Sequence, residues 1–137
     1  MRSRLVSWLP VLACSVLLGC ELLTRPELEE DFRLGPGQSA AIAGTDLVIT
    51  FRKVVEDSRC PSTVVCVWAG NGKVELLART SDGGTSPQIL GTPSGPLEVA
   101  VGQYRIRVLG LDPYPQDPEA QPISPDDYRL SLRVSSE

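Results

Sequence analysis

The chain has 137 residues, with 13 Lys and Arg, 17 Asp and Glu, four Cys and no His. This length fits a single domain, and the lack of His excludes Ser-His-Asp or Cys-His catalysis, imidazole metal ligands and a His pH switch. A net charge of −4 argues against nucleic acid as the partner, because phosphate binding requires a concentration of Lys and Arg.

Residues 1–19 have the pattern of a secretory signal peptide. Arg2 and Arg4 precede an apolar run that is shorter than the roughly 20 residues of a membrane-spanning helix. The run ends in Leu17-Leu18-Gly19-Cys20, which resembles the lipobox of bacterial lipoproteins. This resemblance implies cleavage before Cys20 and attachment of lipid, palmitate included, to Cys20. The alternatives are an uncleaved anchor and an ordinary signal that is cut elsewhere.

The lipobox resemblance also implies a location. Lipid on Cys20 makes the membrane the first expected partner and the bacterial cell envelope the expected compartment. Glu21, which is not Asp, implies the outer membrane in a Gram-negative cell. Cleavage removes two bases and no acid, so 11 bases then face 17 acids and the net charge becomes −6. Lipid rather than a basic patch is therefore expected to hold the protein at the membrane.

The mature chain divides into a tether, residues 20–30, and a β domain, residues 31–137. The tether is acidic and has no strand periodicity, and its roughly ten residues span about 30 Å if extended. In the β domain, alternation of apolar and polar residues predicts strands between turns rich in Gly, Pro, Asp and Ser. The strongest are Asp46–Val55, Lys73–Thr80, Gln103–Leu111 and Asp127–Val134, and the weaker ones are Phe32–Leu34, Gln38–Ile42, Gln88–Leu90 and Leu97–Val101.

Each strong strand places an apolar set on one face. The sets are Leu47, Ile49 and Phe51; Val74, Leu76 and Ala78; Tyr104, Ile106 and Val108; and Tyr128, Leu130, Leu132 and Val134. No amphipathic helical stretch follows the tether. The pattern predicts an all-β fold, a single antiparallel β-sandwich or small barrel of about 7–8 strands.

Two thiols remain in the predicted mature chain besides the lipidated one. An exported protein meets an oxidising compartment, so we expect Cys60 and Cys66 to form a disulfide. A ring this small contributes about 2 kcal/mol. The C-x5-C spacing differs from the C-x-x-C of thiol oxidoreductases, and two thiols make an incomplete zinc site. We therefore expect a structural bridge, no metal and no cofactor.

The sequence around this pair forms a distinctive motif. It reads Asp57-Ser58-Arg59-Cys60-Pro61, then Cys66, then Trp68-Ala69-Gly70. The motif resembles that of an uncharacterised family of small exported bacterial proteins, often lipoproteins. The resemblance covers most of the β domain, including the strand of Tyr104 and the segment Asp112-Pro113-Tyr114-Pro115. It implies the fold and export, and it implies nothing about chemistry.

Three motif residues are candidate binding residues: Asp57, Arg59 and Trp68. Asp57 is suited to capping the loop by accepting backbone N–H groups. Arg59 is expected to pair with Asp57 or Glu56, or to lie over the Trp68 ring. Two interpretations of Trp68 stay open: it plugs one end of the sandwich beneath the disulfide, or it forms an exposed platform with Arg59 for a partner.

Two further features lie in the second half of the chain. Four arginines, Arg105, Arg107, Arg129 and Arg133, fall on the outward faces of their strands. They predict either a basic stripe for an acidic polymer or phospholipid, or a solvated face paired with acids such as Glu75 and Glu98. The segment Asp112–Asp127 holds five Pro and five acids. It is either a solvated surface loop, a binding loop or, from oxygen ligands alone, a calcium site.

These observations predict a membrane-anchored module that is not an enzyme and that binds a protein or an envelope polymer through loops at one end. The alternative is a structural or assembly component of the cell envelope. A third hypothesis, an enzyme that uses carboxylates or calcium, has no specific motif in the sequence to support it.

Overall fold

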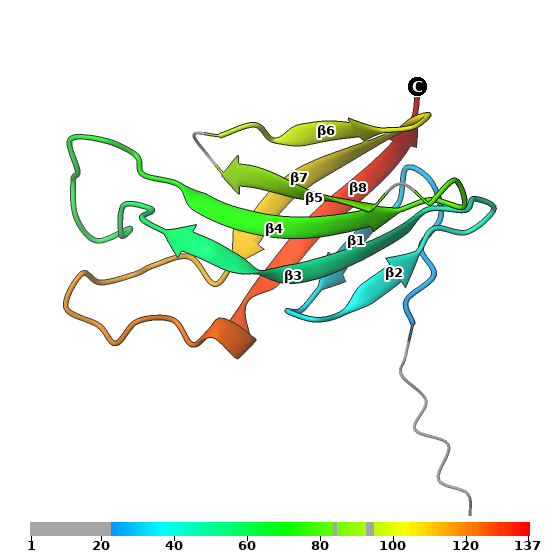
Figure 1. Cartoon of the computed structure of the whole chain (residues 1–137). Helices are drawn as coiled ribbons and strands as arrows, with labels where there is room; N and C mark the ends of the chain where they lie inside the picture. The colour runs from blue at the N-terminus through cyan, green and yellow to red at the C-terminus, as the bar shows by residue number, and fades with distance from the viewer. Residues whose placement is uncertain (1–22, 84, 93–94) are drawn as a thin grey trace, which may run out of the picture.

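The structure, a computed structural model, is an all-β sandwich and describes residues 23–83, 85–92 and 95–137. The predicted signal peptide and Cys20 lie outside these residues. In these residues eight strands form two antiparallel sheets that face each other and do not close into a barrel, so the sandwich prediction is confirmed (Figure 1). The strands are β1 Asp31–Leu34, β2 Ser39–Ala41, β3 Val48–Asp57, β4 Gly72–Arg79, β5 Thr85–Thr92, β6 Glu98–Val101, β7 Tyr104–Asp112 and β8 Arg129–Ser136.

The strand order brings particular loops together. One sheet has the order β1-β8-β7-β6 and the other β2-β3-β4-β5, so the chain changes sheets after β1 and after β5. In Figure 1 the β3–β4 connection and the β7–β8 connection lie at one end of the sandwich, which we call the loop end. The C-terminus and the first described residues lie towards the other end.

The core confirms the predicted apolar sets. All thirteen residues of the four apolar sets listed above are buried. They pack with residues from three of the weaker strands, β1, β2 and β5: Phe32, Leu34, Ala40 and Leu90. Leu111 is also buried although strict alternation from Val108 points it outward. A register shift between Val108 and Gly110 supplies the extra residue, because a β-bulge reverses the phase of the side chains that follow it.

Strand β3 is bulged twice before it reaches the loop end. Its register against β4 shifts between Phe51 and Lys53 and again between Val54 and Glu56. As a result Phe51 is buried, Val54 and Asp57 are half-buried, and Val55 is exposed. Bulges increase the local twist of a strand. They bring the carboxylate of Asp57 to the inner side of the loop end.

The described part of the segment predicted as a tether lies against the sandwich. Thr24 forms a parallel bridge with Ala40, and the Ala41 N–H donates to the Thr24 carbonyl at 2.9 Å. Farther along, the Glu29 N–H donates to the Val134 carbonyl at 2.8 Å, and Leu28 packs against the core. The described part of this segment is therefore held against the sandwich from Thr24 onwards.

Candidate functional site

The candidate site is built on the disulfide loop, residues 58–71, which joins β3 to β4 at the loop end. The predicted bridge between Cys60 and Cys66 is present, with the two Cα atoms 5.9 Å apart. Below it, backbone hydrogen bonds close the neck of the loop: the Ser58 N–H donates to the Asn71 carbonyl at 2.8 Å and the Cys60 N–H to the Ala69 carbonyl at 2.9 Å. The loop is thus closed both covalently and by its backbone.

Gly70 permits this close neck. Its φ is +70°, a conformation that side-chain-bearing residues rarely adopt. A Cβ atom at this position would lie 1.7 Å from the Ser58 carbonyl oxygen. The Gly of the Trp-Ala-Gly motif is therefore required by the geometry of the loop itself.

Arg59 is the anchor of the loop and is only 4% exposed. Its Nε donates to Asp57 Oδ1 at 2.7 Å, and its Nη2 donates to Asp57 Oδ2 at 2.6 Å. The other guanidinium donors reach the β7–β8 side, where Nη1 donates to the Leu111 carbonyl and Nη2 to the Pro113 carbonyl at 2.9 Å. A bidentate pair with these added acceptors satisfies a buried guanidinium, which would otherwise be costly to desolvate. Of the three partners expected for Arg59, the structure shows Asp57.

Asp57 serves as the acceptor at the centre of the network. Its Oδ1 accepts the Arg59 backbone N–H at 3.3 Å, the predicted capping role, and its Oδ2 accepts the Tyr128 hydroxyl at 2.9 Å. Burial raises the pKa of Asp57, but the hydrogen bonds from Arg59 and Tyr128 and the Arg59 charge outweigh it, and the pKa lies below its ordinary value. Burial and the hydrogen bond to Asp57 raise the pKa of Tyr128 to about 12.

Trp68 lies in neither of the predicted positions. It is 81% exposed, so the interpretation as a plug beneath the disulfide is wrong. The platform with Arg59 is not formed either, because Arg59 is buried and its Cζ lies 5.0 Å from the centroid of the Tyr114 ring. Glu56, the other proposed partner of Arg59, pairs instead with Lys73 at 2.7 Å. The structure thus separates Trp68 from the two polar candidates.

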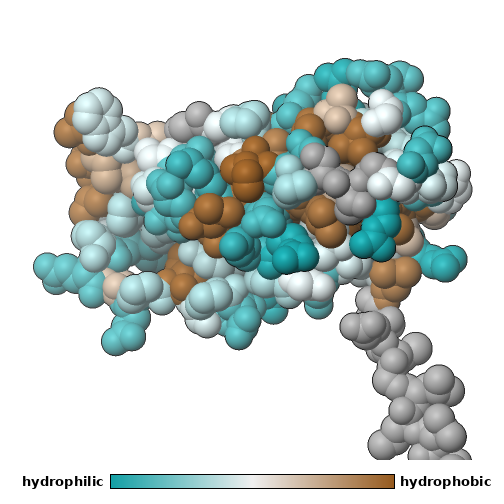
Figure 2. Space-filling view, viewed as in Figure 1, coloured by the Kyte–Doolittle hydropathy of each residue, from teal (hydrophilic) through white to brown (hydrophobic). Residues whose placement is uncertain are grey.

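Trp68 instead belongs to an exposed apolar tip with Val65 and Val67. These valines are 102% and 87% exposed, and Val64 beside them is 40% exposed. Figure 2 shows hydrophobic residues at the end of the molecule where Figure 1 places the β3–β4 connection. Residues 60–72 contain no charged side chain. The molecule therefore carries a projecting, uncharged apolar surface on a closed loop.

A second segment lies beside the disulfide loop: residues 113–128, which we call the acidic segment. The Ser62 N–H donates to the Pro115 carbonyl at 3.0 Å and the Thr63 N–H to the Gln116 carbonyl at 3.2 Å. The Thr63 hydroxyl donates to the same Gln116 carbonyl at 2.6 Å. A hollow of about 460 Å³ runs under the acidic segment, with Arg59, Tyr114 and Tyr128 in its wall. The two loops therefore form one composite surface.

The four arginines do not form a free basic stripe. Arg105 pairs with Glu98 and Glu137, both at 2.8 Å, and Arg133 pairs with Asp31 at 2.6 Å. The Arg129 guanidinium donates to the backbone carbonyls of Asp126 and Tyr128. Among the described residues, Arg107 alone of the four has no such partner, and Glu75 pairs with Lys53 on the other sheet. The paired, solvated face is the interpretation that agrees with these contacts.

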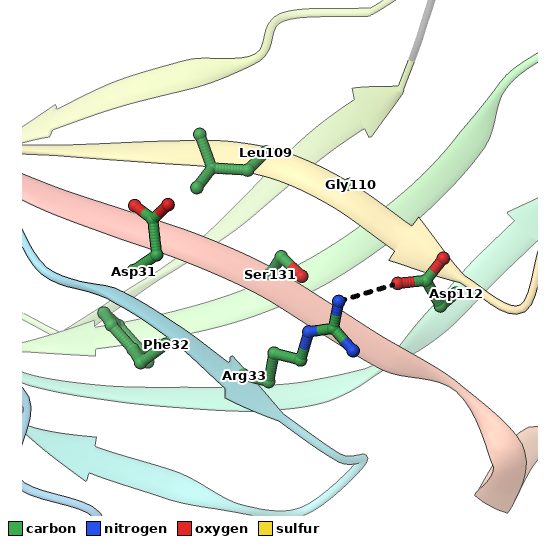
Figure 3. A pocket seen from close by; sticks show the side chains of 7 residues that line it. All are labelled: Asp31, Phe32, Arg33, Leu109, Gly110, Asp112 and Ser131. Atoms are coloured by element: carbon green, nitrogen blue, oxygen red, sulfur yellow. Dashed lines mark ion pairs between the residues drawn. The ribbon is translucent and has the colours of Figure 1, made fainter.

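Another hollow, of about 560 Å³, lies on the outer face of the β1-β8-β7-β6 sheet (Figure 3). Arg33 extends towards Asp112, with Nη2 and Oδ2 3.6 Å apart, and Leu109 and Ser131 also line the hollow. Asp31, on the same wall, is engaged by Arg133. The charges here neutralise each other pairwise, and the groups are exposed, so the arrangement does not select a ligand.

Within the described parts of the chain, no three Cys, Asp or Glu side chains gather to hold a metal ion, so the calcium hypothesis for residues 112–127 gains no support. In those same parts no helix has the length and apolar character to span a membrane. Comparisons with protein-family models, curated proteins and solved structures find no match to the chain.

Sequence reasoning found Asp57, Arg59 and the disulfide but missed Tyr114 and Tyr128 as their partners. Tyr128 was expected in the core, where it lies, and its hydroxyl contact with Asp57 spans 71 positions of sequence. A local sequence pattern cannot predict a contact over such a distance in sequence. The run of apolar, uncharged residues around Val65 was the available signal for an exposed tip.

The buried pair should be required for stability. Arg59→Met leaves Asp57 half-buried without its cation, and removing one member of a buried pair typically costs about 3–5 kcal/mol. Arg107→Met, a substitution of the same kind at an exposed arginine, should change the free energy of unfolding by less than about 0.5 kcal/mol. Urea unfolding measures both. Equal effects of the two substitutions would contradict the role given to Arg59.

Asp57 should also contribute to acid sensitivity. Because its folded pKa is below the ordinary value of 3.8, its stabilising contribution is complete above that value and is lost as the pH falls through the folded pKa. Asp57→Asn should therefore make the free energy of unfolding less dependent on pH between about pH 5 and 2. Asp31→Asn, which removes an ion pair with Arg133 on the surface, should have a smaller effect because solvent screens it. An unchanged pH profile in Asp57→Asn would contradict the network.

Proposed function

We propose that this chain is a non-enzymatic binding module, anchored to a membrane of the bacterial cell envelope by lipid on Cys20, that binds a protein or envelope polymer through its loop end. The observation that carries the proposal is the apolar tip. Val65, Val67 and Trp68 stand almost fully in solvent on a loop whose base is closed by a disulfide and a buried ion pair.

An exposed apolar tip on a rigid base is suited to binding. Contiguous exposed apolar residues on a soluble domain commonly mark interaction surfaces, and Trp is among the residues that contribute most to binding energy. The rigid base lowers the entropy that binding must remove, since the loop is held by its own covalent and polar contacts before a partner arrives.

The short distance along the chain from Cys20 to the described domain also supports the proposal. Cys20 precedes the first described residue, Leu23, by three residues, which span at most about 11 Å. The first described residues lie away from the loop end (Figure 1). An anchor at Cys20 would hold the domain close to its membrane and leave the loop end directed to the aqueous side.

The non-enzymatic assignment rests on the polar groups near the tip and on the composition. Asp57, Arg59 and Tyr128 are engaged with one another, and the chain has no His. Stabilisation of the loop is therefore enough to explain these hydrogen bonds, and no catalytic role is needed.

The anchor can be tested by itself. Cys20→Ala should abolish incorporation of radiolabelled palmitate and move the protein from the membrane fraction to the soluble fraction of the encoding bacterium. Cys14→Ala is the matched control and should leave both unchanged, because Cys14 lies before the predicted cleavage point. Retained labelling in Cys20→Ala would refute the anchor.

Binding through the tip can be tested by site-specific photocrosslinking in the envelope of the encoding bacterium. Val67→p-benzoylphenylalanine should give a discrete adduct, because this position is exposed on the apolar tip. Gln103→p-benzoylphenylalanine, at an exposed position in the β6–β7 turn, is the control and should not give that adduct. Trp68→Ala should decrease the adduct from position 67. The absence of an adduct, or identical adducts from both positions, would refute the binding hypothesis.

A further inference from the structure

The charge distribution of the loop end specifies the partner further. The apolar tip lies in residues 60–72, which contain no charge, whereas the acidic segment 113–128 contains four acids and no base. These acids, Asp117, Glu119, Asp126 and Asp127, are all exposed, and none forms an ion pair with another described residue. The loop end therefore combines an apolar projection with unneutralised negative charge.

The two parts of this surface are held in fixed relation. Ser62 and Thr63 of the disulfide loop hydrogen-bond to Pro115 and Gln116 of the acidic segment, and Arg59 bonds to the Pro113 carbonyl. Asp117 follows Gln116 directly, and its carboxylate accepts the Glu119 N–H at 2.9 Å. The first two carboxylates thus belong to a turn that is attached to the loop bearing the tip.

We propose that the partner is a protein with an apolar pocket bordered by Lys or Arg side chains, into which the Trp68 tip inserts. This inference rests on the proposed function and names the class of its partner. A projecting tip requires a concave partner, and the acids beside it require a basic border, because electrostatic complementarity governs which partners approach.

Two other partners fit the surface less well. A glycan polymer stacks on aromatic rings, but its polar surface does not match the aliphatic side chains of Val65 and Val67. These two valines are the most exposed part of the tip. A bilayer accepts apolar residues, but anionic lipids repel the four carboxylates. In addition, the proposed anchor connects to the membrane from the end of the domain opposite the tip.

The experiment compares the crosslink from position 67 in three backgrounds. Asp117→Asn/Glu119→Gln removes two carboxylates beside the tip, and Glu27→Gln/Asp82→Asn removes two exposed carboxylates away from the loop end. We expect the first pair to lower the adduct yield about threefold or more and the second to leave it unchanged. Raising NaCl from about 50 to 300 mM should lower the wild-type yield, since salt screens exposed charges. Peptides mapped from the adduct should carry Lys or Arg beside apolar residues.

Vesicles provide the second readout. Trp68 is the only Trp after residue 19, so its emission reports on the tip alone in the mature protein. Phosphatidylcholine vesicles, with or without phosphatidylglycerol, should leave this emission unchanged. A blue shift with either vesicle would assign the tip to a bilayer, and an adduct with glycan would assign it to a polymer, and each result would overturn the inference.

The failures of the two proposals are distinguishable. No adduct from position 67 in any background refutes the binding function and this inference with it. An adduct that requires Trp68 but is insensitive to both salt and the Asp117→Asn/Glu119→Gln pair refutes only the basic-bordered pocket.

Discussion

The loop end depends on one buried guanidinium. Arg59 joins two parts of the chain that are more than 50 positions apart. One is the end of β3, through Asp57, and the other is the passage from β7 into the acidic segment, through the Leu111 and Pro113 carbonyls. A buried charge that loses one of its partners destabilises the fold strongly. The positions of these two parts are therefore linked, and a change in one affects the other.

This link explains how an apolar tip can stand in solvent without collapsing onto the domain. The disulfide ring is short, and both its neck and its flank are occupied by hydrogen bonds, to Ala69 within the loop and to Pro115 in the acidic segment. The closed loop is too short for the Val65 and Trp68 side chains to fold back onto the domain. Exposure of the tip is thus imposed by the polar contacts beneath it.

The strands were predictable from sequence because alternation is a local property. All eight predicted strands are present, and sets such as Leu47, Ile49 and Phe51 are buried, since a residue's face in a strand follows from its neighbours two positions away. The alternation of buried and exposed residues is broken before Leu111, where a bulge adds a residue that the sequence pattern does not predict. Asp57 was among the three expected partners of Arg59 because the two residues are two positions apart, but the sequence did not decide between it, Glu56 and Trp68.

The position of Trp68 was not predictable by the same reasoning. The usual preference of large apolar residues for burial favoured a position beneath the disulfide over the exposed platform, but the choice depends on which segments meet at the loop end. Tyr114 of the acidic segment lies over Arg59, in the position that the cation–π alternative gives to Trp68. This contact joins residues more than 50 positions apart. The feature that best supports a function is therefore the one for which local pattern was least informative: an aromatic side chain excluded from a core that is already complete without it.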